Sequence, residues 1–123
     1  MKSTDEMLHD LRQTDSALEN VIHRKAKLFR PPYGVTNPMI AQAIQKGDYT
    51  SIGWSIRTFD TTTRDSKKLL KKATQNIQNG DVILFHDWGH QTIAILPEFI
   101  HQIRAKGFEI VGLDILLKTK PYF

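Results

Sequence analysis

The sequence contains no cysteine, and this absence excludes disulfide bonds and thiolate metal sites. It also has no apolar run near the roughly 20 residues that a membrane-spanning helix needs, so we expect no membrane span. Residues 1–10 have no apolar core, which predicts no secretory signal within them. No glycine-rich phosphate loop and no serine-centred nucleophile elbow occur. The cellular location is therefore left open.

What is present is ordinary for a small globular protein. Of the 123 residues, 40% are hydrophobic and 24% are charged, and we expect residues 1–123 to form a single domain. Most of the excess in the net charge of +4 lies in four lysines. They are Lys67, Lys68, Lys71 and Lys72. No aromatic residue interleaves with them, so we interpret them as a solvated helix face and expect no nucleic-acid partner.

Apolar residues at helical spacing and end signals predict five helices. Residues 4–23 form the first, and Asn37 caps a second that has Pro38 at its first position and stops at Gly47. Asp65 or Ser66 opens a third, which Gly80 ends. A fourth has Pro97 near its start and ends at Gly107. Residues 113–117 form a short final helix.

Between these helices, four short segments have the composition of strands. They are 27–30, 50–54, 81–86 and 108–111, and a threonine-rich loop follows the second through Thr63. Residues 82–85 are apolar in a row, which suits a strand buried on both faces of a parallel sheet. The alternation predicts an α/β fold of about four parallel strands with helical crossovers. Four strands form either a small open sheet or part of a larger barrel.

Polar residues that could carry chemistry follow three of these strands. Arg30, Asp60 and His86 each come near the carboxyl end of a strand, and such ends gather at one rim in α/β folds. Each alone has a structural interpretation, namely a surface ion pair, a turn residue and a core histidine. Together they indicate a site, because a histidine held by an aspartate has the form of a general acid or base. An arginine can orient a neighbouring carboxylate and keep it ionised.

Three motifs in this order resemble the last three motifs of the polysaccharide deacetylase family. This is the NodB-like group, carbohydrate esterase family 4. The motifs are residues 29–34 (Phe-Arg-Pro-Pro-Tyr-Gly), Trp54 with Asp60, and residues 84–87 (Leu-Phe-His-Asp). The pattern from Leu96-Pro97 to Leu113 also fits. The resemblance implies the C-terminal part of a distorted (β/α) barrel, with the barrel incomplete. It also implies removal of acetyl groups from chitin-like sugars, peptidoglycan or xylan. Family members are often exported or associated with the cell envelope.

The resemblance also implies a role for each matching residue. His86 matches the general acid that protonates the leaving group, and Asp60 matches the carboxylate that holds and tunes it. Arg30 matches the residue that orients the catalytic base. Tyr33 matches the residue whose backbone N–H helps to hold the oxyanion, and Leu84 matches part of the pocket for the acetyl methyl group. These are the predicted catalytic and substrate-binding residues.

The sequence departs from the family pattern in its metal-binding motifs. The family's Asp-Asp pair, which supplies the base and one metal ligand, and its His-rich motif are not found. His9, His23, His90 and His101 show no metal-ligand spacing, so we assign no metal ligand. The zinc-like divalent metal that the family implies therefore has no ligands in this chain. Thr61 stands where the family usually has Trp, and Arg57 where it usually has Asp.

Two functions follow as hypotheses. The first is a metal-dependent deacetylase acting on an acetylated carbohydrate, with its base and metal motifs in a segment outside this chain. The second is a catalytically inactive, truncated module with a carbohydrate-binding or assembly role. In either case we expect the chain alone to be inactive. An incomplete barrel leaves an open sheet edge, so we also expect a homo-oligomer formed through that edge or by exchange of the first helix.

Overall fold

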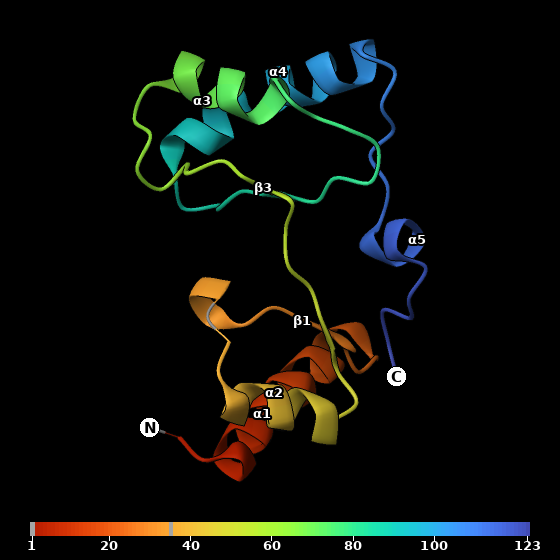
Figure 1. Cartoon of the computed structure of the whole chain (residues 1–123). Coiled ribbons are helices and arrows are strands. Elements are labelled where there is room, and N and C mark those ends of the chain that lie inside the picture. Colours follow the sequence, from red (N-terminus) through yellow and green to blue (C-terminus); the bar gives the residue numbers. More distant parts are fainter. Residues whose placement is uncertain (1, 35) are drawn as a thin grey trace. The chain divides into compact units, whose positions relative to one another are not determined.

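The computed structural model of the chain describes residues 2–34 and 36–123 (Figure 1). The chain is an α/β protein with short parallel strands. The chain divides into two compact units. One comprises Met1–Gly53 and Leu113–Phe123, and the other comprises Trp54–Gly112. That residues 1–123 act as a single domain stays a prediction. None of the helices in the described residues has both the length and the apolar character to cross a membrane.

In the first unit, two helices begin at residues that satisfy their own backbone donors. Helix α1 (Thr4–Ile22) starts at Ser3, whose hydroxyl accepts from the Glu6 amide while the Glu6 carboxylate accepts from the Ser3 amide. Helix α2 (Pro38–Lys46) starts at Asn37, whose side chain accepts from the Ile40 amide at 2.9 Å. The predicted starts and ends of both helices are confirmed to within one residue.

Close packing between these helices requires a glycine at the end of α2. A Cβ atom on Gly47 would lie 2.4 Å from the Tyr49 ring and 2.9 Å from the Leu8 side chain. Leu8 is the buried residue of α1, and Ala43 is the buried residue of α2. Gly47 therefore allows the chain to turn closely over the contact between the two helices.

The strands of the first unit pair in parallel. Strand β1 (Leu28–Phe29) pairs with β2 (Thr50–Ser51), and an isolated antiparallel bridge joins Ala26 to Tyr122. After β1 the chain forms a single 3₁₀ turn, η1 (Pro32–Gly34). The short helix α5 (Leu113–Leu117) lies where the sequence predicts it.

The second unit contains the other parallel pair and two helices that pack together. Strand β3 (Ile56–Arg57) pairs with β4 (Ile83–Leu84), with Ile56 opposite Ile83. Helix α3 (Ser66–Thr74) packs beside helix α4 (His90–Ala105), as Figure 1 shows. The core cluster consists of Ala73, Phe99 and Ile103, against which Ile83 and Phe85 of the β4 segment also pack.

The structure corrects four details of the prediction. Strand β3 lies in the segment that we interpreted as a loop, because a two-residue strand is defined by its pairing with β4 rather than by its composition. Helix α3 ends at Thr74, not at Gly80. Residues 108–111 form no strand among the described residues, and the Phe108 amide instead donates to the Ile103 carbonyl at the end of α4.

The fourth correction concerns Pro97, which lies well inside α4 rather than near its start. Proline lacks the N–H that would bond to the carbonyl four residues earlier. That carbonyl belongs to Ile93, a residue on the exposed face of α4 that is 60% exposed. The helix begins at His90, seven residues before the proline.

Candidate active site

The candidate site in the second unit is built on the pairing of β3 with β4. Asp60 follows β3 and His86 follows β4, so both lie beyond the carboxyl ends of parallel strands. The His86 ring Nδ1 lies 2.9 Å from Asp60 Oδ1, and the His86 backbone amide donates to Asp60 Oδ2 at 2.6 Å. The carboxylate therefore holds both the ring and the backbone of the histidine. The expected proximity of Asp60 to His86 is confirmed; the catalytic roles stay predictions.

The two partners differ sharply in exposure. The Asp60 side chain is 2% exposed, whereas the His86 side chain is 40% exposed. Because Nδ1 is taken by the carboxylate, Nε2 is the ring nitrogen available for proton transfer. This is the arrangement that a general acid requires: one nitrogen fixed, the other within reach of a substrate.

Asp60 is kept ionised by the groups around it. Burial acts to raise the pKa of the Asp60 carboxyl, but hydrogen bonds from the His86 ring, the His86 amide and the Thr92 hydroxyl outweigh it, and the pKa is lowered. Thr92, in the first turn of α4, donates to Asp60 Oδ2 at 2.8 Å. An ionised Asp60 can accept from Nδ1–H, which leaves Nε2 as the ring nitrogen that can take up and release a proton.

A strained turn precedes the buried carboxylate. Phe59 has a φ of 56°, in the left-handed region that bulky residues rarely adopt. Its carbonyl accepts from the Thr62 and Thr63 amides at 3.1 and 2.9 Å and from the Thr62 hydroxyl. These bonds close a tight turn, and the residue after Phe59, Asp60, is buried with its carboxylate against His86.

Arg30 and Tyr33 belong to the first unit, where each has its own local geometry. The Arg30 guanidinium donates to the carbonyls of Ile52 and Gly53, at 3.3 and 3.2 Å, just beyond β2. Tyr33 has a φ of 58° and is 97% exposed, in the turn that the Gly34 amide closes on the Pro31 carbonyl. The Pro-Pro-Tyr-Gly run is thus a turn as expected. That Arg30 and Tyr33 share one rim with His86 stays a prediction.

Leu84 lies on β4 and is buried, at 9% exposure. Its carbonyl accepts from the hydroxyl of Thr58, which is itself 1% exposed. This bond ties the segment after β3 to β4 immediately before the two site residues. The role of Leu84 in an acetyl pocket stays a prediction.

The described residues do not fit the divalent metal that the family resemblance implies. Among residues 2–34 and 36–123, no three His, Asp or Glu side chains lie close enough together to hold an ion. A catalytic metal site needs about three protein ligands.

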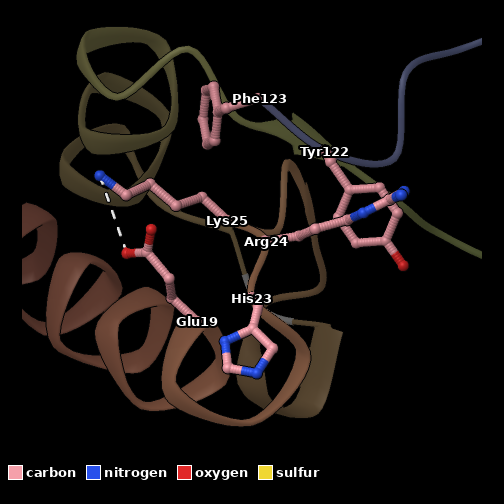
Figure 2. Close-up of a pocket in the computed structure, with 6 residues that line it drawn as sticks. All are labelled: Glu19, His23, Arg24, Lys25, Tyr122 and Phe123. Carbon is pink, nitrogen blue, oxygen red and sulfur yellow. Dashed lines mark ion pairs between the residues drawn. The ribbon is translucent and has the colours of Figure 1, made fainter.

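A hollow of about 370 Å³ occurs in the first unit (Figure 2). Six residues line it: Glu19, His23, Arg24, Lys25, Tyr122 and Phe123. Lys25 pairs with Glu19 at 3.9 Å, and the Arg24 guanidinium lies 5.1 Å from the centre of the Tyr122 ring. None of the predicted catalytic residues lines it, and we assign it no function.

Two residues of the site, Thr92 and Phe59, are not predicted by the sequence pattern. Thr92 was not recognised because a threonine early in a helix is common and nothing in its spacing marks a bond to Asp60, 32 residues earlier. Phe59 was not recognised because a left-handed backbone is usually signalled by Gly, Asn or Asp. Both depend on contacts made only in the folded protein.

The second unit thus has short parallel strands with a histidine and a buried aspartate beyond their carboxyl ends. Comparison with known proteins shows which family has this arrangement. The family model for polysaccharide deacetylases matches residues 1–52. The chain is also 35% identical over 103 residues to a bifunctional xylanase/xylan deacetylase of Cellvibrio japonicus, covering 80% of this chain and 15% of that protein.

Two further comparisons extend over more of the chain. A peptidoglycan-N-acetylglucosamine deacetylase of Listeria monocytogenes is 29% identical over 119 residues, covering 97% of this chain and 25% of that protein. A family 4 carbohydrate esterase from Streptomyces lividans superposes with a TM-score of 0.77 at 28% identity, covering 86% of this chain and 55% of that one. The chain belongs to the polysaccharide deacetylase family and corresponds to part of its domain. It spans a quarter or less of the length of the two relatives compared by sequence.

Proposed function

We propose that this chain provides the general acid of a polysaccharide deacetylase that hydrolyses acetyl groups on a carbohydrate. The observation that carries the proposal is the His86–Asp60 contact, with Nδ1 held at 2.9 Å by a buried carboxylate. The names of the relatives, which include xylan and peptidoglycan deacetylases, support the same chemistry.

In the proposed reaction, His86 acts when the tetrahedral intermediate collapses. Nε2–H donates its proton to the leaving nitrogen or oxygen of the sugar, and Asp60 keeps the ring in the orientation for that transfer. The Tyr33 backbone N–H donates to the oxyanion, and Leu84 contacts the acetyl methyl group. Arg30 orients the base, which we place in a segment outside this chain. If a divalent metal takes part, as the family resemblance implies, it would supply Lewis-acid chemistry, and no ligand for it is assigned among the described residues.

The proposal also concerns the fold. We propose that β1 to β4 are strands of a (β/α) barrel. In the described residues they form two separate parallel pairs. Each pair thus has edges that further strands of a barrel would cover. If the chain folds alone, we propose that copies associate through these edges. Sedimentation should then give a dimer or larger species, and a monodisperse monomer at high micromolar concentration would refute the association.

Acetate release tests the catalytic proposal. The chain alone, with Zn²⁺ and acetylated chito-oligosaccharides, should release no acetate above background. The same chain joined to a preceding segment that carries the family's Asp-Asp and His-rich motifs should release it. In that longer protein, His86→Ala should lower the rate by about 10²- to 10⁴-fold.

The matched control is His101→Ala, because His101 is exposed on α4 and belongs to the same unit. It should leave the rate unchanged. A longer protein that retains its full rate with His86→Ala would overturn the role of His86 as the acid. Release by the chain alone that disappears with His86→Ala would instead show that the missing motifs are dispensable.

A further inference from the structure

The positive charge of the protein is concentrated in the segment of the chain that contains Asp60. Residues 57–72 contain six Lys and Arg against two Asp, which is a surplus of four. The remaining residues contain eleven of each sign, so this segment accounts for the whole net charge of +4. We call its six cationic residues the basic surface: Arg57, Arg64, Lys67, Lys68, Lys71 and Lys72.

No carboxylate neutralises the basic surface in the described part of the chain. The salt bridges there involve other residues, and none includes a member of the basic surface. Of the two aspartates in the segment, Asp60 is buried against His86. The other, Asp65, caps α3 by accepting from the amides of Lys67 and Lys68.

This concentration of charge is unfavourable for the helix that carries it. Lys67 and Lys71, and likewise Lys68 and Lys72, are four residues apart on α3 and lie on the same helical faces, where like charges repel. Lys67 and Lys68 also lie in the first turn, where the helix dipole disfavours cations. A helix face with mixed charges would avoid both effects. We therefore expect the basic surface to bind an anionic partner.

An aromatic ring lies among these cations, which the order of residues in the sequence does not reveal. The Arg57 guanidinium lies 4.9 Å and the Lys72 ammonium 5.7 Å from the centre of the Phe59 ring. Phe59 is 49% exposed. The ring holds the two cations without neutralising them, and its exposed part is free to stack on the apolar face of a sugar.

The basic surface is joined to the candidate active site through this same residue. Phe59 directly precedes Asp60, and its carbonyl accepts from the Thr63 amide. Lys72 in turn donates to the Thr63 hydroxyl at 3.3 Å. Phe59 and its two cations thus adjoin the residue whose carboxylate holds the His86 ring.

We propose that the basic surface and the Phe59 ring bind a polysaccharide that carries carboxylates in addition to its acetyl groups. This inference rests on the proposed function and narrows its substrate class from acetylated glycans in general to acidic ones. A nucleic acid fits less well, because binding of a single strand uses several stacked aromatic residues and only Phe59 interleaves here.

Binding to the 123-residue chain, without any turnover, tests the inference. The probes are a hyaluronan oligosaccharide, which is acetylated and carboxylated, and a neutral chito-oligosaccharide of the same length. Isothermal titration at low salt should show hyaluronan binding at least roughly ten-fold more tightly. The difference should disappear at about 0.5 M NaCl, where surface charges are screened.

Charge reversal locates the binding surface. Lys68→Glu with Lys72→Glu should remove the preference for hyaluronan. The matched control is Lys118→Glu with Lys120→Glu, which changes the net charge equally on two exposed lysines of the other unit and should retain the preference. Circular dichroism shows whether the first double variant folds. If it does not, the double variant Lys68→Gln with Lys71→Gln is used instead, and it should reduce the preference for hyaluronan by roughly three-fold or more.

Three outcomes would overturn the inference: equal binding of the two sugars, equal loss in the control, or a charge-matched oligothymidylate that binds as tightly as hyaluronan. The last outcome would indicate a surface that binds polyanions in general.

Failure of the proposed function is distinguishable from these outcomes. Acetate release by the longer protein without a preference for acidic sugars refutes this inference alone, whereas hyaluronan binding without acetate release refutes the deacetylase alone.

Discussion

Asp60 holds His86 at two points, with one carboxylate oxygen at the ring Nδ1 and the other at the backbone amide. The two residues are 26 positions apart, and they meet because β3 and β4 run in parallel and end together. The carboxylate is buried while the ring is partly exposed. This relationship leads to the first two predictions.

Acid should destabilise the second unit through Asp60. Its pKa is lowered in the folded protein, so the carboxylate contributes stability above its unfolded pKa of about 3.9, and that contribution is lost as the pH falls through the folded value. We expect the free energy of unfolding to fall from about pH 4 downward. Urea titrations from pH 7 to pH 2 measure it. Asp60→Asn should be less stable at pH 7 but should lose less on acidification, and an equal acid loss in both proteins would refute the assignment.

Removal of the Thr92 hydroxyl should weaken the same site. Thr92→Val keeps the shape of the side chain but takes one hydrogen bond from a buried carboxylate, which we expect to cost about 1–3 kcal/mol in unfolding free energy. The control is Thr14→Val at an exposed position of α1. Its free energy of unfolding should lie within about 0.5 kcal/mol of that of the parent protein. Equal stabilities of the two variants in urea would show that the bond to Asp60 contributes nothing.

The left-handed turn at Phe59 should distinguish substitutions by their backbone preference. Phe59→Gly and Phe59→Val both remove the ring and its two cation contacts, but only glycine adopts a φ of 56° without strain. We expect Phe59→Val to be less stable than Phe59→Gly by about 1–2 kcal/mol. Chemical denaturation gives this difference. ¹⁵N spectra of the His86 ring should show the Nδ1 contact retained with glycine and weakened with valine; identical spectra would argue against the turn as the positioning element.

Gly47 should not tolerate a methyl group. Gly47→Ala would place a Cβ atom 2.4 Å from the Tyr49 ring, and we expect a loss of about 1–3 kcal/mol from overpacking. Gly53→Ala is the control, because a Cβ atom there would meet nothing within 4 Å. Thermal unfolding followed by circular dichroism compares the two. A Gly47→Ala protein as stable as Gly53→Ala would mean that the Tyr49 ring moves aside without cost.

Much of the local structure could be predicted because its signals are contained in a few neighbouring residues. Asn37, Pro38 and Gly47 mark both ends of α2, and the side-chain oxygen of Asn37 bonds within one turn of the helix. The positions of Asp60 and His86 after predicted strands also predict that they lie at one site. Where a prediction failed, as at β3, the missing information was the partner strand. Two residues with extended backbone form a strand only when their backbone groups pair with a neighbouring segment, which for β3 is β4.

The sequence by itself determined the ends of α1 and α2, the family and the residues that could serve as acid and as carboxylate, because each depends on residue type at short spacing. Only the tertiary structure decided that Thr92 completes the shell around Asp60 and that Phe59 takes a left-handed turn among the cations of Arg57 and Lys72. These contacts join residues up to 32 positions apart. Their energies depend on burial and on hydrogen-bond geometry, and neither exists until the helices and strands have packed together.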